Sequence, residues 1–144
     1  MKTKKTIGRA DIVDFPDLGI EGVKAKIDTG AFTSSIHCKK IAVKDDVLSF
    51  HVSIDQDGTT ISKRFETTDY TQKKIRSSNG VVQLRYVIKT KIVLFGKAYP
   101  AQFSLTDRSR MKNPVLLGRK LLKGRFLVDV SEKNLSFDLK KTQK

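Results

Sequence analysis

Cysteine and histidine are scarce in this sequence of 144 residues. It contains one cysteine, Cys38, and two histidines, His37 and His51. A single cysteine excludes an intramolecular disulfide framework and a cysteine-based zinc site, so the core alone must hold the fold. Zinc needs three or four ligands, and the sequence has no His-Glu-x-x-His spacing. Because adjacent residues of a strand point to opposite faces, we expect a buried Cys38 and a hydrogen-bonded His37, with no metal.

Two further kinds of chemistry lack the residues that they need. No glycine-rich loop ends in Gly-Lys-Ser/Thr, so an ATP site is not expected. A thiol nucleophile would pair Cys38 with His37 or His51, but nothing in the sequence indicates a third group to orient the base. We therefore expect no cofactor and no cysteine-based catalysis.

Long apolar runs are also absent. The hydrophobic fraction is 38% and the mean hydropathy is -0.34, and no run approaches the roughly 20 apolar residues of a membrane-spanning helix. The basic segment at residues 1–8 is not followed by the apolar region of a signal peptide. We expect a single cytoplasmic domain over residues 1–144, with an ordered core at about 7–139 and a frayed basic tail at 140–144.

Acidic residues are few compared with basic ones. There are 15 Asp and Glu against 29 Lys and Arg, which gives a formal net charge of +14. Such a charge attracts anionic partners, either nucleic acid or an acidic polypeptide. The lysines form only short clusters along the chain, which is weaker evidence for nucleic acid than one dense basic helix. A lysine-rich surface without a specific partner is the alternative.

β-Strand patterns run through most of the chain. Alternating or β-branched segments occur at residues 23–27, 47–54, 81–88, 91–95 and 101–105. Turn signals separate them, and Asn79-Gly80 predicts the tip of a hairpin. Only residues 117–124 look helical, for about two turns that end at Gly124. Together these features predict an all-β closed barrel with one short C-terminal helix.

The segment most informative about chemistry is Asp28-Thr29-Gly30. An acid follows an apolar strand directly and is followed by a tight turn. Thr29 could fix that turn through its hydroxyl, and Gly30 allows the backbone to approach the carboxylate. Nearby amides could then hold the carboxylate in one orientation. The same triplet also occurs in ordinary turns, so it does not establish a catalytic role alone.

A second segment near the C-terminus makes the pattern specific. Leu116-Leu117-Gly118-Arg119 ends a strand at a glycine and begins the short helix. With the upstream Asp-Thr-Gly-Ala and the glycine-tipped hairpin, its order and spacing resemble retropepsins. The sequence is most similar to their bacterial branch, retropepsin-like aspartic endopeptidases often labelled "ATP-dependent zinc protease". The resemblance extends from about Ile7 to Leu139.

The resemblance implies an aspartic peptidase with a retropepsin-like closed barrel. Asp28, Thr29 and Gly30 would be catalytic, and a homodimer would supply the second Asp28. Arg119 and Gly118 would support the site structurally. Substrate would contact Ala31 and a flap formed by Ser77, Ser78, Asn79 and Gly80.

The flap departs from the viral pattern because it is basic and polar instead of apolar and rich in glycine. This difference suggests acidic peptide or protein substrates. The family also tends to occur with ATP-grasp ligases that add glutamates to protein C-termini, so such a ligase is an expected partner and a glutamate tail an expected substrate.

Two alternatives belong to other functional classes. One is a non-catalytic retropepsin fold that binds or regulates an acidic partner. The other is a small basic β-barrel that binds nucleic acid through exposed aromatic rings. The phenylalanines mostly alternate with polar residues, as core positions do, so nucleic acid is not the expected ligand.

Overall fold

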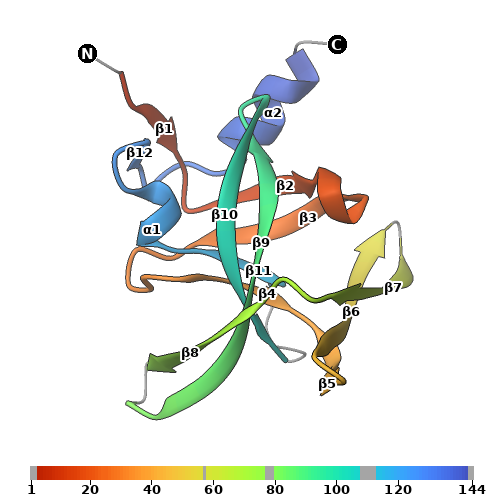
Figure 1. Cartoon of the computed structure of the whole chain (residues 1–144). Helices are drawn as coiled ribbons and strands as arrows, with labels where there is room; N and C mark the ends of the chain where they lie inside the picture. The colour runs from red at the N-terminus through yellow and green to blue at the C-terminus, as the bar shows by residue number, and fades with distance from the viewer. Residues whose placement is uncertain (1–2, 57, 77–79, 108–112, 143–144) are drawn as a thin grey trace.

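The computed structural model describes residues 3–56, 58–76, 80–107 and 113–142 of the chain (Figure 1). Strands dominate it. In chain order the elements are β1 (Lys5–Ile7), β2 (Ala10–Phe15), the 3-10 helix η1 (Pro16–Leu18), β3 (Ile20–Ile27), β4 (Ser34–His37), β5 (Lys39–Lys44), β6 (Val47–Gln56), β7 (Thr59–Thr67), β8 (Thr71–Arg76), β9 (Val82–Leu94), β10 (Lys97–Thr106), β11 (Val115–Leu117), α1 (Arg119–Leu122), β12 (Phe126–Val128) and α2 (Leu135–Thr142).

Six strands of the described chain close into a barrel. The order is β10-β4-β11-β3-β2-β9, and β9 pairs back onto β10 in antiparallel register. Strand β11 lies between β3 and β4 and runs parallel to β3. The long β9 and β10 cross in front of β2 and β3 in Figure 1. The predicted all-β closed barrel is therefore confirmed.

Period-2 alternation places the core inside this barrel. In β3, Val23, Ala25 and Ile27 are buried, while Lys24 and Lys26 are exposed. Phe15 of β2 and Phe103 of β10 are fully buried and meet edge to face, with ring centroids 5.3 Å apart. Burying one such side chain stabilises the fold by roughly 1.5–3 kcal/mol. The predicted core role of the aromatic residues is thus confirmed at these positions and at Phe50 and Phe126.

Two extensions project from the barrel. Strands β5, β6 and β7 form a separate antiparallel sheet, in which Phe50 stacks on Phe65. Strand β8 pairs with the first half of β9 to form a hairpin, from Thr71 opposite Val87 to Arg76 opposite Val82. The segments predicted as separate strands at 81–88 and 91–95 form the single strand β9, whose second half belongs to the barrel.

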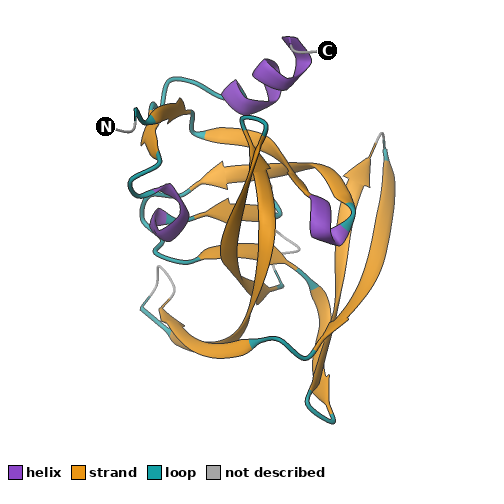
Figure 2. Cartoon of the chain, turned by 45° about the horizontal axis from the view of Figure 1, so that its top comes forward, coloured by secondary structure: helices purple, strands orange, loops and turns teal. Residues whose placement is uncertain are grey.

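The prediction of one helix was wrong. Helix α1 lies within the predicted segment 117–124 but spans only four residues, about one turn, because Leu117 belongs to β11. Gly124 after it has a φ of +79°. A second helix, α2, follows β12 and lies beside the start of β2 (Figure 2). The prediction of a frayed tail at 140–144 is wrong for residues 140–142, because α2 continues to Thr142 and the Lys140 Nζ lies 2.8 Å from Asp14 Oδ2. Residues 143–144 lie outside the described part of the chain.

Tertiary contacts explain why α2 escaped prediction. The carboxylate of Asp11, 1% exposed, accepts hydrogen bonds from the backbone amides of Ser136 and Phe137 at 3.0 and 3.1 Å. The Ser136 hydroxyl accepts one from the Phe95 amide at 2.8 Å. An acid more than 100 positions away in sequence thus caps the helix, which local patterning cannot reveal.

No helix in the described part of the chain has both the length and the apolar character required to cross a membrane.

Candidate active site

Asp28 lies directly after the last residue of β3. Its amide donates a hydrogen bond to the carbonyl oxygen of Leu117 at 2.9 Å, which extends the parallel pairing of β3 and β11 by one residue. Its side chain is half-buried. The carboxylate is therefore carried by the end of a barrel strand, on backbone that the neighbouring strand holds in place.

The turn after Asp28 folds back onto its side chain. The Gly30 amide donates to Asp28 Oδ1 at 3.0 Å, and the Ala31 amide donates to the Asp28 carbonyl at 3.2 Å. A Cβ on residue 30 would lie 3.3 Å from Oδ1, which is a tight contact. Among the described residues, the Thr29 hydroxyl does not make the predicted contact with the turn. The carbonyl oxygen of Thr29 instead accepts a hydrogen bond from the Arg119 side chain. The Gly30 amide thus orients the Asp28 carboxylate.

The Gly118-Arg119 element packs against this turn. The Arg119 amide donates to the Ala31 carbonyl at 2.8 Å, and its Nη1 donates to the Thr29 carbonyl at 2.9 Å. A Cβ on Gly118 would lie 2.8 Å from the carbonyl oxygens of both Ala31 and Phe32. Only a glycine admits this approach without displacing the loop.

Three residues of this network were missed in the sequence analysis. The hydroxyl of Ser34, which is buried, accepts a hydrogen bond from the Gly118 amide at 3.0 Å. The carbonyl of Phe32 accepts one from the Lys120 amide at 2.9 Å, and the Arg119 guanidinium lies over the Phe32 ring at 5.9 Å. The signal for Ser34 was its place two residues before the apolar Ile36 on an inward-facing strand, where a buried hydroxyl needs a partner.

The β8–β9 hairpin forms at the place where the sequence predicted a flap. Its strands pair as far as Arg76 and Val82, and Gly80 has a φ of +84°, which favours glycine. Ser77, Ser78 and Asn79 lie outside the described residues. Figures 1 and 2 both place the paired end of this hairpin on the side of the molecule where α1 lies.

Comparison with known proteins decides the family. A family model described as "Retropepsin-like aspartic endopeptidase RimB" matches residues 6–137. The chain belongs to this RimB-like family. The match includes the Asp28 turn, the β8–β9 hairpin and the Gly118-Arg119 element of the RimB-like chain.

Curated relatives carry a different name. A probable alpha-L-glutamate ligase of Parasynechococcus marenigrum is 33% identical over 99% of the chain, which covers 32% of that protein. One of Shewanella halifaxensis is 38% identical over 90% of the chain and is covered to 29%. The RimB-like chain thus spans less than a third of the length of these relatives.

A solved structure supports the fold. The crystal structure of a protein of unknown function from Legionella pneumophila matches with a TM-score of 0.69 and 23% sequence identity. The match covers 93% of the RimB-like chain and 99% of the other chain. At this level of identity the likeness concerns the fold alone.

In the described part of the RimB-like chain, His37, Cys38 and His51 do not form a metal site. Cys38 is fully buried, and burial raises the pKa of its thiol far above the ordinary value. A thiol that stays protonated is a poor nucleophile. His37 Nδ1 lies 3.7 Å from Asp107 Oδ1. Among the described residues, no three His, Cys, Asp or Glu side chains are placed to hold a metal ion.

Proposed function

We propose that the protein is an aspartic-type peptidase whose active site forms between two copies of the chain, each contributing Asp28. The observation that carries this proposal is the mounting of the Asp28 carboxylate. It follows a barrel strand and accepts a hydrogen bond from the Gly30 amide. Its loop is held by hydrogen bonds from Arg119 and by the close packing of Gly118. Membership of the RimB-like family supports the assignment.

The second copy follows from the chemistry of peptide hydrolysis. Two carboxylates about 3 Å apart share one proton, because both cannot ionise cheaply at that distance. The ionised carboxylate accepts a proton from the attacking water, while the protonated one polarises the scissile carbonyl. The sequence contains one Asp-Thr-Gly, so a two-fold symmetric dimer supplies the partner carboxylate.

The β8–β9 hairpin would close over the bound peptide and exclude water from the dyad. Near its tip, β9 exposes the apolar side chains of Val82 and Leu84, which are 50% and 61% accessible. The other strand of the hairpin, β8, carries the basic residues Lys73, Lys74 and Arg76. A flap with this composition favours an extended peptide that carries acidic side chains.

A glutamate-rich substrate agrees with the net charge of +14 and with the relatives. In proteins named probable alpha-L-glutamate ligases, a segment similar to this chain forms about a third of the polypeptide. A peptidase that acts on glutamate tails, in company with an ATP-grasp glutamate ligase, would account for that association. A glutamate tail is a substrate for this chain only if the peptidase prefers acidic peptides.

A substitution at Asp28 tests the proposal. We expect D28N to lose cleavage of a glutamate-rich peptide by at least a thousandfold, because an amide can neither share the dyad proton nor accept one from water. Cleavage is followed by mass spectrometry, and circular dichroism reports that the fold is retained. D17N, which removes the charge of an exposed acid in η1, is the matched control. Equal cleavage by D28N and D17N would refute the peptidase assignment.

A second candidate function is a non-catalytic module that binds an acidic partner. The observation that favours it is the name of the relatives, which describes ligation and not hydrolysis. Such a module would bind a glutamate peptide without cleaving it, whether or not Asp28 is present. Nucleic-acid binding is less well supported, because Phe15, Phe50, Phe103 and Phe126 are buried in the core. Phe32 is the one phenylalanine classed as exposed, at 56%, and a single ring is not a stacking surface for successive bases.

A further inference from the structure

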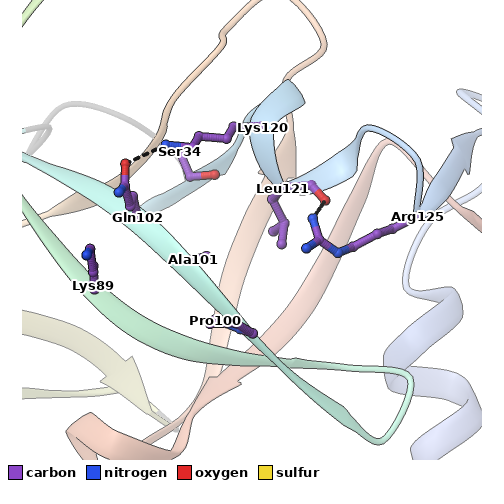
Figure 3. Close-up of a pocket in the computed structure, with 8 residues that line it drawn as sticks. All are labelled: Ser34, Lys89, Pro100, Ala101, Gln102, Lys120, Leu121 and Arg125. Carbon is purple, nitrogen blue, oxygen red and sulfur yellow. Dashed lines mark hydrogen bonds between the residues drawn. The ribbon is translucent and has the colours of Figure 1, made fainter.

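A basic pocket lies beside the loop of residues 28–32 (the Asp28 loop), between α1 and the strands β9 and β10. It has a volume of about 270 Å³ and is lined by Ser34, Lys89, Pro100, Ala101, Gln102, Lys120, Leu121 and Arg125 (Figure 3). None of these lining residues is acidic. The pocket adjoins the Asp28 loop, because the Lys120 amide is bonded to the Phe32 carbonyl and Ser34 holds the Gly118 amide.

Two ammonium groups converge on one oxygen atom at its edge. Lys120 Nζ from α1 donates to Gln102 Oε1 at 2.7 Å, and Lys73 Nζ from the flap strand β8 donates to the same oxygen at 2.9 Å. Figure 3 shows Lys120 reaching across to Gln102, with Lys89 projecting from the adjacent strand. None of the ion pairs in the described part of the chain involves these three lysines.

This arrangement holds like charges together without a counter-charge. The pKa of Lys120 is lowered, first by desolvation and then by the positive charge of Lys73, with Lys89 as a smaller cause. A neutral amide oxygen offers only a partial charge to the two amines. An anion placed between them would replace repulsion with two charge-assisted hydrogen bonds, which are about twice as strong as neutral ones.

The walls of the pocket favour a carboxylate on an alkyl stem. Pro100, Ala101 and Leu121 provide apolar surface beside the lysines, which suits the methylene groups of a glutamate or aspartate side chain. Arg125 is already engaged, because its Nη1 donates to the Leu121 carbonyl at 3.0 Å and its guanidinium lies over the Tyr99 ring. Lys73 and Lys120 instead share one neutral oxygen, that of Gln102, and an incoming carboxylate could replace it as their acceptor.

We propose that Lys73 and Lys120, with Lys89 behind them, form a subsite that binds a carboxylate side chain of the peptide substrate. This inference rests on the proposed function in taking the ligand to be a peptide that lies along the Asp28 loop. It adds a specificity role: the subsite selects peptides that carry an acidic side chain. Because Lys73 belongs to the flap strand and Lys120 to α1, the bound carboxylate also ties the hairpin to the barrel.

The test is peptide binding by the full chain in a D28N background, where cleavage does not interfere. The probes are fluorescein-labelled tetraglutamate and tetraglutamine peptides, followed by fluorescence anisotropy at 0.15 M salt. We expect K73Q/K120Q to weaken tetraglutamate binding at least tenfold, since each charge-assisted bond is worth about a tenfold change or more. Tetraglutamine binding should change by less than twofold.

K24Q/K133Q is the matched control, because it removes the same charge from two exposed lysines outside the pocket. An equal loss of tetraglutamate binding in both double variants would overturn the subsite, since general charge would then explain the affinity. Unchanged binding in K73Q/K120Q would also overturn it. Displacement of the peptide by inorganic phosphate at lower concentration than by free glutamate would overturn the assignment to a carboxylate.

The subsite and the peptidase assignment fail separately. Cleavage that survives D28N refutes the peptidase assignment. In the chain with Asp28 intact, the subsite predicts that K73Q/K120Q lowers the ratio of kcat/KM for glutamate-rich over glutamine-rich peptides at least tenfold. An unchanged ratio refutes the subsite and leaves the peptidase assignment standing.

Discussion

Replacing Gly118 by alanine tests whether close packing of the Gly118-Arg119 element holds the Asp28 loop. The backbone of Gly118 has a φ of -96° and a ψ of 178°, which alanine adopts readily. Judged by the backbone alone, G118A should be neutral or stabilising by about 0.4–1 kcal/mol. The obstacle is the added Cβ, which would lie 2.8 Å from the carbonyl oxygens of Ala31 and Phe32.

The expected cost follows from what must move. Relieving the clash displaces the loop and weakens the bonds that its two carbonyls accept from the amides of Arg119 and Lys120. Each such bond contributes about 0.5–1.5 kcal/mol, and overpacking costs about 1–3 kcal/mol. We expect G118A to lower the free energy of unfolding by about 2–4 kcal/mol. A shift of the Asp28 carboxylate by about 1 Å would also cost roughly a hundredfold in cleavage rate.

Urea denaturation at a fixed protein concentration measures this difference. G96A is the control, because Gly96 has a φ of +74° and open space around its missing Cβ. Alanine there meets backbone strain of about 1–2 kcal/mol without a clash. If the packing argument is right, G118A is less stable than G96A. A G118A chain as stable as the wild type would refute it.

Two further predictions concern buried groups. Burial raises the pKa of Asp11 above 3.8, so the folded state binds this proton more tightly than the unfolded state. The contribution of Asp11 to stability therefore falls as pH rises from 3.8 through the folded pKa. Urea denaturation across this range should show that the difference in unfolding free energy between the wild type and D11N changes with pH, and a constant difference would contradict the raised pKa. Cys38 is buried and its thiol pKa is raised. We therefore expect iodoacetamide, followed by mass spectrometry, to modify Cys38 at least a hundredfold faster in urea than in the native protein. Equal rates would show that the thiol is accessible to solvent in the native fold.

Local patterns were sufficient wherever burial follows a simple period. The alternation of Val23, Ala25 and Ile27 with lysines identified β3 and so placed Asp28 at its end. Leu117 followed by Gly118 identified the strand end that meets it. These features depend on residues close in sequence, which is why the barrel and the position of the triplet could be predicted.

Contacts between residues that are distant in sequence determine helix α2, the Ser34 contact and the lysine pair. The alternation of Leu135, Phe137 and Leu139 with polar residues hides a helix, which forms because Asp11 caps it. The Ser34 hydroxyl finds the Gly118 amide only after β4 and β11 have paired. The convergence of Lys73 and Lys120 on Gln102 brings three separate elements together. No single-sequence pattern encodes these meetings, because each depends on the completed register of the sheet.

The central claim is that two copies of Asp28 form one active site, and mixing subunits tests it most directly. Wild-type chain is equilibrated with a tenfold excess of the D28N chain, so that nearly every wild-type subunit has a variant partner. If each site needs Asp28 from both chains, cleavage of a glutamate-rich peptide falls by roughly tenfold, whereas the same excess of D17N raises it. Activity unaffected by the D28N chain would contradict the shared site, because each wild-type chain would then be catalysing alone.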